Sequence, residues 1–115
     1  MKLSEHFSEK ELACPCCGLY IPNTALLIAL EHVRFSLGPV MVNSSTRCAK
    51  HNKEVGGADK SRHLTGEAAD ITVKNTSPSV VFSGLDNSGF SNLIGLGKYK
   101  NFVHLDTRGY KARWG

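Results

Sequence analysis

The sequence predicts one α+β domain over residues 1–115, with a small antiparallel sheet packed against helices. Three observations lead to this prediction. The chain has 115 residues, of which 41% are hydrophobic, and this is enough for one core. Its first half shows helical periodicity, and its second half shows mostly strand-like alternation with one further helix. Helices that precede the strands, rather than alternate with them, are typical of the α+β class.

The first half predicts two helices with clear ends. Ser8–Glu11 has the Ser-x-x-Glu pattern of a capping box, so a short helix is expected to begin there, with Phe7 and Leu12 as its hydrophobic staple. The main helix is expected over Thr24–Leu37, because Gly38 and a proline follow it. Its apolar side chains recur at helical spacing and predict a buried stripe: Leu26, Leu30, Val33 and Leu37.

The remaining elements follow from turn signals and alternation. In chain order they are a strand over Val40–Asn43, a helical segment over Ala49–Val55, a strand carrying Asp70, a helix from Pro78 to near Asn87, a strand over Phe90–Leu96, a turn over Gly95–Tyr99 and a strand over Phe102–Arg108.

The stretch Ser61–Asp70 predicts a metal site. His63 offers an imidazole nitrogen and Asp70 a carboxylate oxygen, a ligand combination that catalytic zinc sites use. A spacing of seven residues could also place both on one helix face. Gly66 interrupts the stretch, however, and the residues around Asp70 alternate like a strand, so we expect a loop with His63, a turn and a strand with Asp70.

The third metal ligand is expected from the last strand. Phe102, His104, Asp106 and Arg108 would share one of its faces, because side chains alternate along a strand. A row of His, Asp and Arg is costly to bury without partners, so we expect it to line a wet cleft opposite Asp70. His104 is then the third ligand.

These two segments resemble the motifs of the zinc D-Ala-D-Ala carboxypeptidase family. Residues 61–70 match its Ser-x-His-x-x-Gly-x-Ala-x-Asp pattern, and residues 102–108 look like the third-ligand strand of small phage endolysins and bacterial cell-wall peptidases. The resemblance implies the fold shared with hedgehog domains, a Zn²⁺ cofactor held by His63, Asp70 and His104, and peptidoglycan peptides as substrate.

The resemblance leaves the general base open. Zinc would activate a water, and relatives often carry Asp or Glu three residues before the third ligand to accept its proton. Asn101 stands there in this chain and cannot act as a base. Asp106 is the expected substitute, although it could instead pair with Arg108 or orient a ligand. Glu67 is a weaker candidate.

Two further residues match substrate-contacting positions of the relatives. Arg47 corresponds to an arginine that contacts the substrate's carboxylate or carbonyl, for which a guanidinium is well suited. Ser61 corresponds to a serine that hydrogen-bonds the substrate. We expect Arg47 to take part in catalysis as well, and Arg108 to bind substrate.

The four cysteines permit three interpretations. Cys14, Cys16 and Cys17 crowd one turn, and Cys48 stands apart. They could be reduced thiols packed as small hydrophobes, ligands of a structural zinc, or a disulfide from Cys14 or Cys17 to Cys48. Adjacent cysteines are a poor spacing for zinc. Similar cysteines in relatives imply that the two segments touch.

Charge and composition limit the partners. The net charge of +4 suits an acidic cell-wall polymer or simple solubility, and no nucleic-acid-binding motif accompanies it. No apolar run reaches the roughly 20 residues of a membrane span. No signal peptide is visible, so we expect synthesis in the cytoplasm and action on the wall after release.

We therefore expect a monomeric zinc metallopeptidase that hydrolyses peptide bonds of bacterial peptidoglycan, phage-like in character. The alternative is a metal-containing binding module of the same fold without turnover, an option that Asn101 favours.

Overall fold

The computed structural model describes residues 1–115 as an α+β fold, which confirms the predicted class. The helices are α1 (Glu9–Leu12), α2 (Thr24–Leu37), α3 (Ala49–Glu54) and α4 (Pro78–Asp86), with the short 3₁₀ turns η1 (Arg62–Thr65) and η2 (Ser91–Leu93). The strands are β1 (Val40–Ser44), β2 (Ala68–Val73), β3 (Gly95–Lys98), β4 (Val103–Asp106) and β5 (Ala112–Trp114).

The helix ends follow the local sequence signals. At α1 the Glu11 carboxylate accepts the backbone N–H of Ser8 at 3.0 Å, as the capping box predicts. Helix α2 has the predicted bounds: the Asn23 side chain accepts the Leu26 N–H at 2.8 Å, and Gly38 ends the helix with φ +112°. Such a positive φ favours glycine, because a Cβ would clash with the backbone.

The five strands form one mixed sheet in the order β1-β2-β4-β3-β5. The pairs β1–β2, β2–β4 and β3–β4 are antiparallel, as predicted, whereas β5 pairs parallel with β3. Strand β5 was not predicted at all. In the pairing of β2 with β4, Asp70 lies opposite His104 and Ala68 lies opposite Asp106.

Two predictions between residues 90 and 99 were wrong. The expected strand over Phe90–Leu96 is instead the turn η2 followed by the start of β3, and the expected turn over Gly95–Tyr99 is mostly strand β3. Glycines at 95 and 97 suggested a turn. Pairing on both sides, with β4 and with β5, holds this segment extended despite its low strand propensity.

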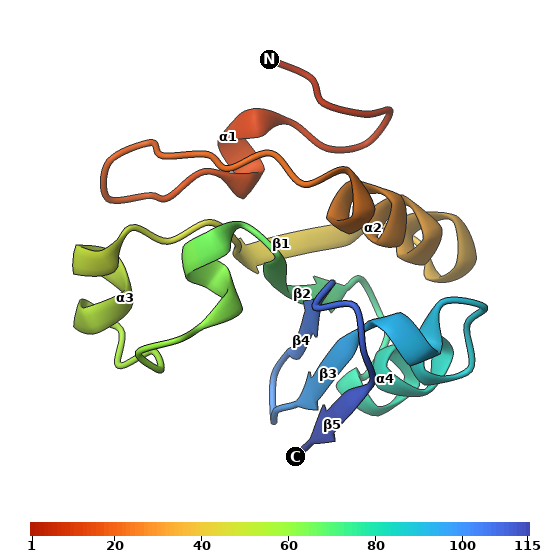
Figure 1. The fold of residues 1–115 in the computed structure, drawn as a ribbon. Helices are drawn as coiled ribbons and strands as arrows, with labels where there is room; N and C mark the ends of the chain where they lie inside the picture. The colour runs from red at the N-terminus through yellow and green to blue at the C-terminus, as the bar shows by residue number, and fades with distance from the viewer.

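The helices α2 and α4 cover one side of the sheet, and α3 and η1 lie on the other side (Figure 1). One hydrophobic cluster lies under α2 and α4 and includes Leu30 of α2, Leu85 of α4, Ile71 of β2 and Leu105 of β4. Alternate residues of β2 and β4 therefore face away from this core, toward α3 and η1. None of the helices is long and apolar enough to span a membrane.

Candidate metal centre

The residues that face away from the core on β2 and β4 meet η1 in space. Asp70 of β2 and His104 of β4 are cross-strand partners, so their side chains emerge side by side. His63 lies on η1, which Ser61 caps by accepting the His63 N–H at 3.2 Å. The Arg47 N–H donates to the His63 carbonyl at 2.9 Å and ties η1 to the segment before α3.

Three side-chain atoms converge at this point. His63 Nε2 lies 3.2 Å from Asp70 Oδ1, and His104 Nδ1 lies 3.1 Å from the same oxygen. The three atoms lie within 4.8 Å of one another. All three residues are nearly buried, with exposures of 2%, 7% and 9% for His63, Asp70 and His104. Their separation along the chain, from residue 63 to 104, shows that tertiary folding assembles the group.

The opposite nitrogen of each imidazole is already occupied. His63 Nδ1 lies 2.7 Å from the Ser45 carbonyl oxygen, and His104 Nε2 lies 2.8 Å from Asp106 Oδ2. Both partners are acceptors, so these nitrogens carry the protons in the neutral rings. The lone pairs of the remaining nitrogens then face Asp70 Oδ1. Three acceptors that point at one another fit a divalent cation, and two imidazoles with one carboxylate are a typical zinc donor set.

Without a metal ion, protons can take its place on the nitrogens that face Asp70, and the imidazoles then donate to this carboxylate. Burial opposes ionisation of Asp70, but hydrogen bonds with His104 and His63 outweigh it and lower the pKa of Asp70 to about 2. Burial also opposes charging of His104, yet hydrogen bonds with Asp106 and Asp70 raise its pKa above the ordinary value. The pocket therefore favours positive charge between its carboxylates, which a proton or a metal ion can provide.

Asp106 is fully buried, with 0% exposure. Its carboxylate accepts hydrogen bonds from Arg108 Nε at 2.8 Å and Nη2 at 2.7 Å, in addition to its contact with His104. Burial would raise the pKa of Asp106, but these partners hold it well below its usual range. Gly95 makes room for the pair, because a Cβ there would lie 2.6 Å from Arg108 Nε.

Arg47 is anchored by all three of its nitrogens. Nη2 donates to Asp70 Oδ2 at 3.2 Å, Nη1 donates to the Asn52 side chain at 3.1 Å, and Nε donates to the Ser44 hydroxyl at 3.0 Å. The two oxygens of the Asp70 carboxylate thus have different partners: Oδ2 accepts from Arg47, and Oδ1 faces the two histidines. A guanidinium has five N–H groups, so two remain for another ligand.

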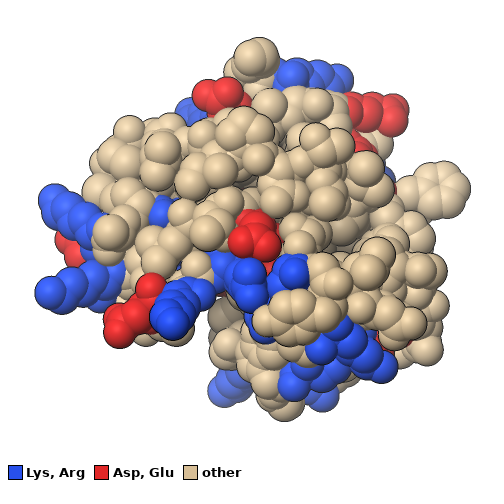
Figure 2. Space-filling model, viewed as in Figure 1, with Lys and Arg blue, Asp and Glu red and all other residues tan.

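A cleft of about 530 Å³ opens over this group. It lies between the segment that carries α3 and η1 and the segment that carries β3, β4 and β5, where Figure 2 shows a notch with Lys and Arg side chains on its rims. The residues that line it are Arg47, Val55, Gly56, Gly57, Ala58, Lys60, Ser61, Arg62, His63, Asp70, Tyr99, Phe102, His104, Arg108 and Trp114. Four of these are Lys or Arg, and Asp70 is the one carboxylate among them.

The other predicted site residues differ in whether they line the cleft. Ser61 and Arg108 line the cleft, together with the metal group and Arg47. Asp106 lies beneath it rather than in its lining. Asn101 is exposed in the turn before β4 and Glu67 pairs with Arg62 at 3.6 Å, and neither residue is among those that line the cleft.

One wall of the cleft was only partly predicted, because Phe102 was expected on the His104 face whereas Tyr99 and Trp114 were not expected to line the site. Tyr99 and Phe102 stack with ring centroids 4.6 Å apart, and Trp114 donates from Nε1 to the Tyr99 hydroxyl at 3.0 Å. The Trp114 ring lies 5.2 Å from the His104 ring and passes close over Gly97, where a Cβ would collide with it. Glycine within a strand marks such close approaches, and Gly97 was the available signal.

Comparison with known proteins agrees with this arrangement. The model of the family described as Peptidase M15 matches residues 5–106. The zinc D-Ala-D-Ala carboxypeptidase of Streptomyces albus G is 31% identical over 87 residues, which are 74% of this chain and 34% of that protein. The chain thus spans about a third of the length of that relative. With a family match over nearly the whole chain and a convergent His63–Asp70–His104 group, the chain belongs to the Peptidase M15 family.

Proposed function

We propose that the protein is a zinc metallopeptidase that hydrolyses peptide bonds of bacterial peptidoglycan. The observation that carries the proposal is the convergence of His63 Nε2, Asp70 Oδ1 and His104 Nδ1 at the floor of a cleft. These three residues would hold the ion. When bound, zinc polarises a peptide carbonyl and activates water for attack on it.

The surrounding residues orient the ligands. The Ser45 carbonyl and the Asp106 carboxylate fix which nitrogen of each histidine is free, and Arg47 holds the second oxygen of Asp70. Partners of this kind set ligand geometry and basicity. We therefore assign Asp106 to positioning His104. Its full burial and its pairing with Arg108 disfavour the alternative role of general base.

The substrate class follows from the charge of the cleft and from the relative. Arg47, Lys60, Arg62 and Arg108 line the cleft, so it suits a peptide that carries carboxylates. The similar Streptomyces protein is named for D-Ala-D-Ala, a carboxylate-terminated dipeptide. We propose that Arg47, with its two free N–H groups, binds a substrate carboxylate or carbonyl together with Ser61 and Arg108. The likeness of residues 102–108 to phage endolysins supports an endolysin-type peptidase.

The test combines metal dependence with product analysis. Purified peptidoglycan and peptides ending in D-Ala-D-Ala are incubated with the zinc-loaded protein, and released D-Ala and new amino termini are identified by mass spectrometry. We expect hydrolysis that a chelator abolishes and zinc restores. His63→Ala should be inactive, whereas His32→Ala, at an exposed position on α2, should remain active. Full activity of His63→Ala would contradict the proposal.

A metal-containing binding module is the second candidate. It is favoured because the cleft lining offers no free carboxylate to act as general base. Asp70 is the one carboxylate there, and it already contacts both histidines and Arg47. Under this alternative, zinc-dependent binding of muropeptides would be measured by calorimetry without any product appearing over long incubation.

A further inference from the structure

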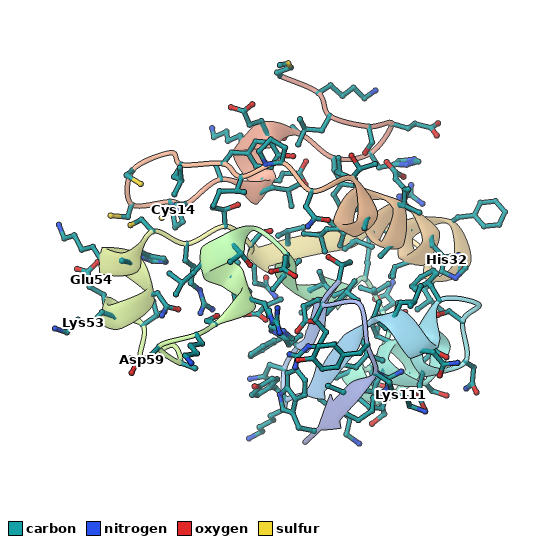
Figure 3. The ribbon with its side chains drawn as sticks, in the orientation of Figure 1. Cys14, His32, Lys53, Glu54, Asp59 and Lys111 are labelled. Atoms are coloured by element: carbon teal, nitrogen blue, oxygen red, sulfur yellow. The ribbon has the colours of Figure 1, made fainter.

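The four cysteines gather at one place, away from the candidate metal centre. Cys14, Cys16 and Cys17 lie on the loop after α1, and Cys48 is the N-cap residue of α3. Figure 3 shows the labelled Cys14 on the side of this loop that faces α3, with sulfur atoms clustered beside it. The sequence-based expectation that the two segments touch is therefore confirmed: the Thr46 N–H also donates to the Leu12 carbonyl at 3.0 Å.

Three of the sulfur atoms form a compact group, and two sulfur–sulfur distances match the edges of a tetrahedral metal site. Cys14 Sγ lies 3.8 Å from Cys48 Sγ, and Cys48 Sγ lies 3.9 Å from Cys16 Sγ. The Sγ atoms of Cys14, Cys17 and Cys48 lie within 4.8 Å of one another. Four thiolates at about 2.3 Å from a zinc ion would be separated by about 3.8 Å along the edges of the tetrahedron. A disulfide would require about 2.05 Å, and all four cysteines are free thiols.

The backbone around the cluster is arranged to stabilise thiolates. The Cys48 N–H points to Cys14 Sγ at 3.5 Å, and the His51 N–H points to Cys48 Sγ at 3.4 Å. Gly18, with φ +79°, closes the turn by donating its N–H to the Cys14 carbonyl at 2.8 Å.

In the sequence, the adjacent Cys16 and Cys17 are a poor spacing for zinc, but the fold removes this objection. Cys14 and Cys17 have the two-residue separation of a zinc-binding turn, and the tertiary structure adds Cys48 from a distant segment. Cys16 lies outside the group of three whose Sγ atoms are all within 4.8 Å of one another, but its Sγ is 3.9 Å from Cys48 Sγ, which makes it the candidate for the fourth ligand.

We infer that Cys14, Cys16, Cys17 and Cys48 form a second, structural zinc site, independent of the proposed peptidase function. The site would join the loop after α1 to the N-terminus of α3. Cys48 directly follows Arg47, so the ion would also hold in place the segment from which Arg47 reaches Asp70. A closed four-thiolate shell leaves no position for substrate, as in other structural zinc sites.

The test counts metal ions in the full chain, purified under reducing conditions with zinc and free of excess metal. We expect native mass spectrometry to find two zinc ions per wild-type chain. His63→Ala should keep one ion, held by the cysteines, and Cys48→Ser should keep one, held by the histidines. Replacing zinc with Co²⁺ should give sulfur-to-cobalt charge-transfer absorption in His63→Ala and none in Cys48→Ser.

A second measurement, on the wild type alone, keeps the inference testable if the Cys48→Ser variant fails to fold. With zinc bound, the four thiols should react slowly with a thiol reagent, and a mercurial should release one zinc ion. A wild-type chain whose bound zinc is all lost in His63→Ala and fully kept in Cys48→Ser, four freely reactive thiols, or a Cys14–Cys48 disulfide in the reduced preparation would each overturn the inference.

Discussion

His104 Nε2 lies 2.8 Å from Asp106 Oδ2, and this contact leaves the other ring nitrogen, Nδ1, available to the pocket. The two residues sit two positions apart on β4, where their side chains share one sheet face. Asp106 is in turn held by Arg108 through two hydrogen bonds from the guanidinium and one from the backbone N–H. Strand β4 thus carries a candidate ligand and the residue that orients it, and Arg108, just beyond the end of the strand, keeps that residue ionised.

Asp106→Asn tests whether Asp106 positions His104 or acts as a base. A positioning role predicts zinc affinity lower by about 10- to 100-fold, the usual effect of losing such a partner, with most activity restored at saturating zinc. Competition with a chromophoric chelator measures the affinity. Asp86→Asn is the matched control, because it also removes a carboxylate paired with an arginine, Arg113, at 2.7 Å. Unchanged zinc affinity with activity lost at all zinc concentrations would assign Asp106 as the base instead.

Gly57→Ala tests the anchoring of Arg47. A Cβ at residue 57 would collide with the Asn52 side chain and lie 2.9 Å from Arg47 Nη1, so the guanidinium must move. We expect KM to rise about tenfold, corresponding to the loss of roughly one charge-assisted hydrogen bond to substrate, with kcat less affected. Gly89→Ala is the control, because its Cβ would meet open space. Steady-state kinetics that match for the two variants would argue against a substrate role for Arg47.

The single tryptophan should report metal binding. Trp114 lies 5.2 Å from the His104 ring, and the chain has no other tryptophan. Titration of the metal-free protein with Co²⁺, which quenches nearby indoles, should therefore reduce the intrinsic fluorescence in a saturable way. His63→Ala should lose this quenching, although Trp114 itself is unchanged. Equal quenching in both proteins would place the responsible metal elsewhere.

The hydrogen bonds to Glu31 should contribute stability that is lost in acid. Its carboxylate accepts hydrogen bonds from the Ser4 hydroxyl at 2.6 Å and the His6 N–H at 2.8 Å. Burial works in the other direction, but these bonds hold the pKa of Glu31 below its ordinary value. The stabilisation is therefore fully present above the unfolded-state pKa of about 4.3 and is lost as the pH falls through the folded-state pKa.

Urea unfolding of the metal-free protein between neutral and acid pH measures this contribution. The difference in unfolding free energy between wild type and Glu31→Gln should be largest near neutral pH and shrink below about pH 4.3. Glu54→Gln, at an exposed position near the end of α3, should show no such pH dependence. A constant difference across the range would contradict the prediction.

Local signals predicted the helices well, because they depend on interactions within one turn. The capping box at Ser8, the bounds of α2 and the start of α4 at Pro78 all appear as expected. The strand predictions were weaker where glycines at 95 and 97 suggested a turn. Those glycines serve close packing against Arg108 and Trp114, contacts with residues that lie far along the chain.

The sequence by itself determined the α+β class, the main helices and the chemical types of the candidate ligands. These depend on the spacing of apolar residues within a segment and on the identity of single residues. Only the tertiary structure decided that His104 presents Nδ1, that Asp106 is buried behind it, that β5 adds Trp114 to the cleft and that Cys48 meets the cysteines after α1. Each of these is set by contacts between segments distant in sequence: strand register and ring orientation for the first three, and the packing of the loop after α1 against the start of α3 for the cysteines.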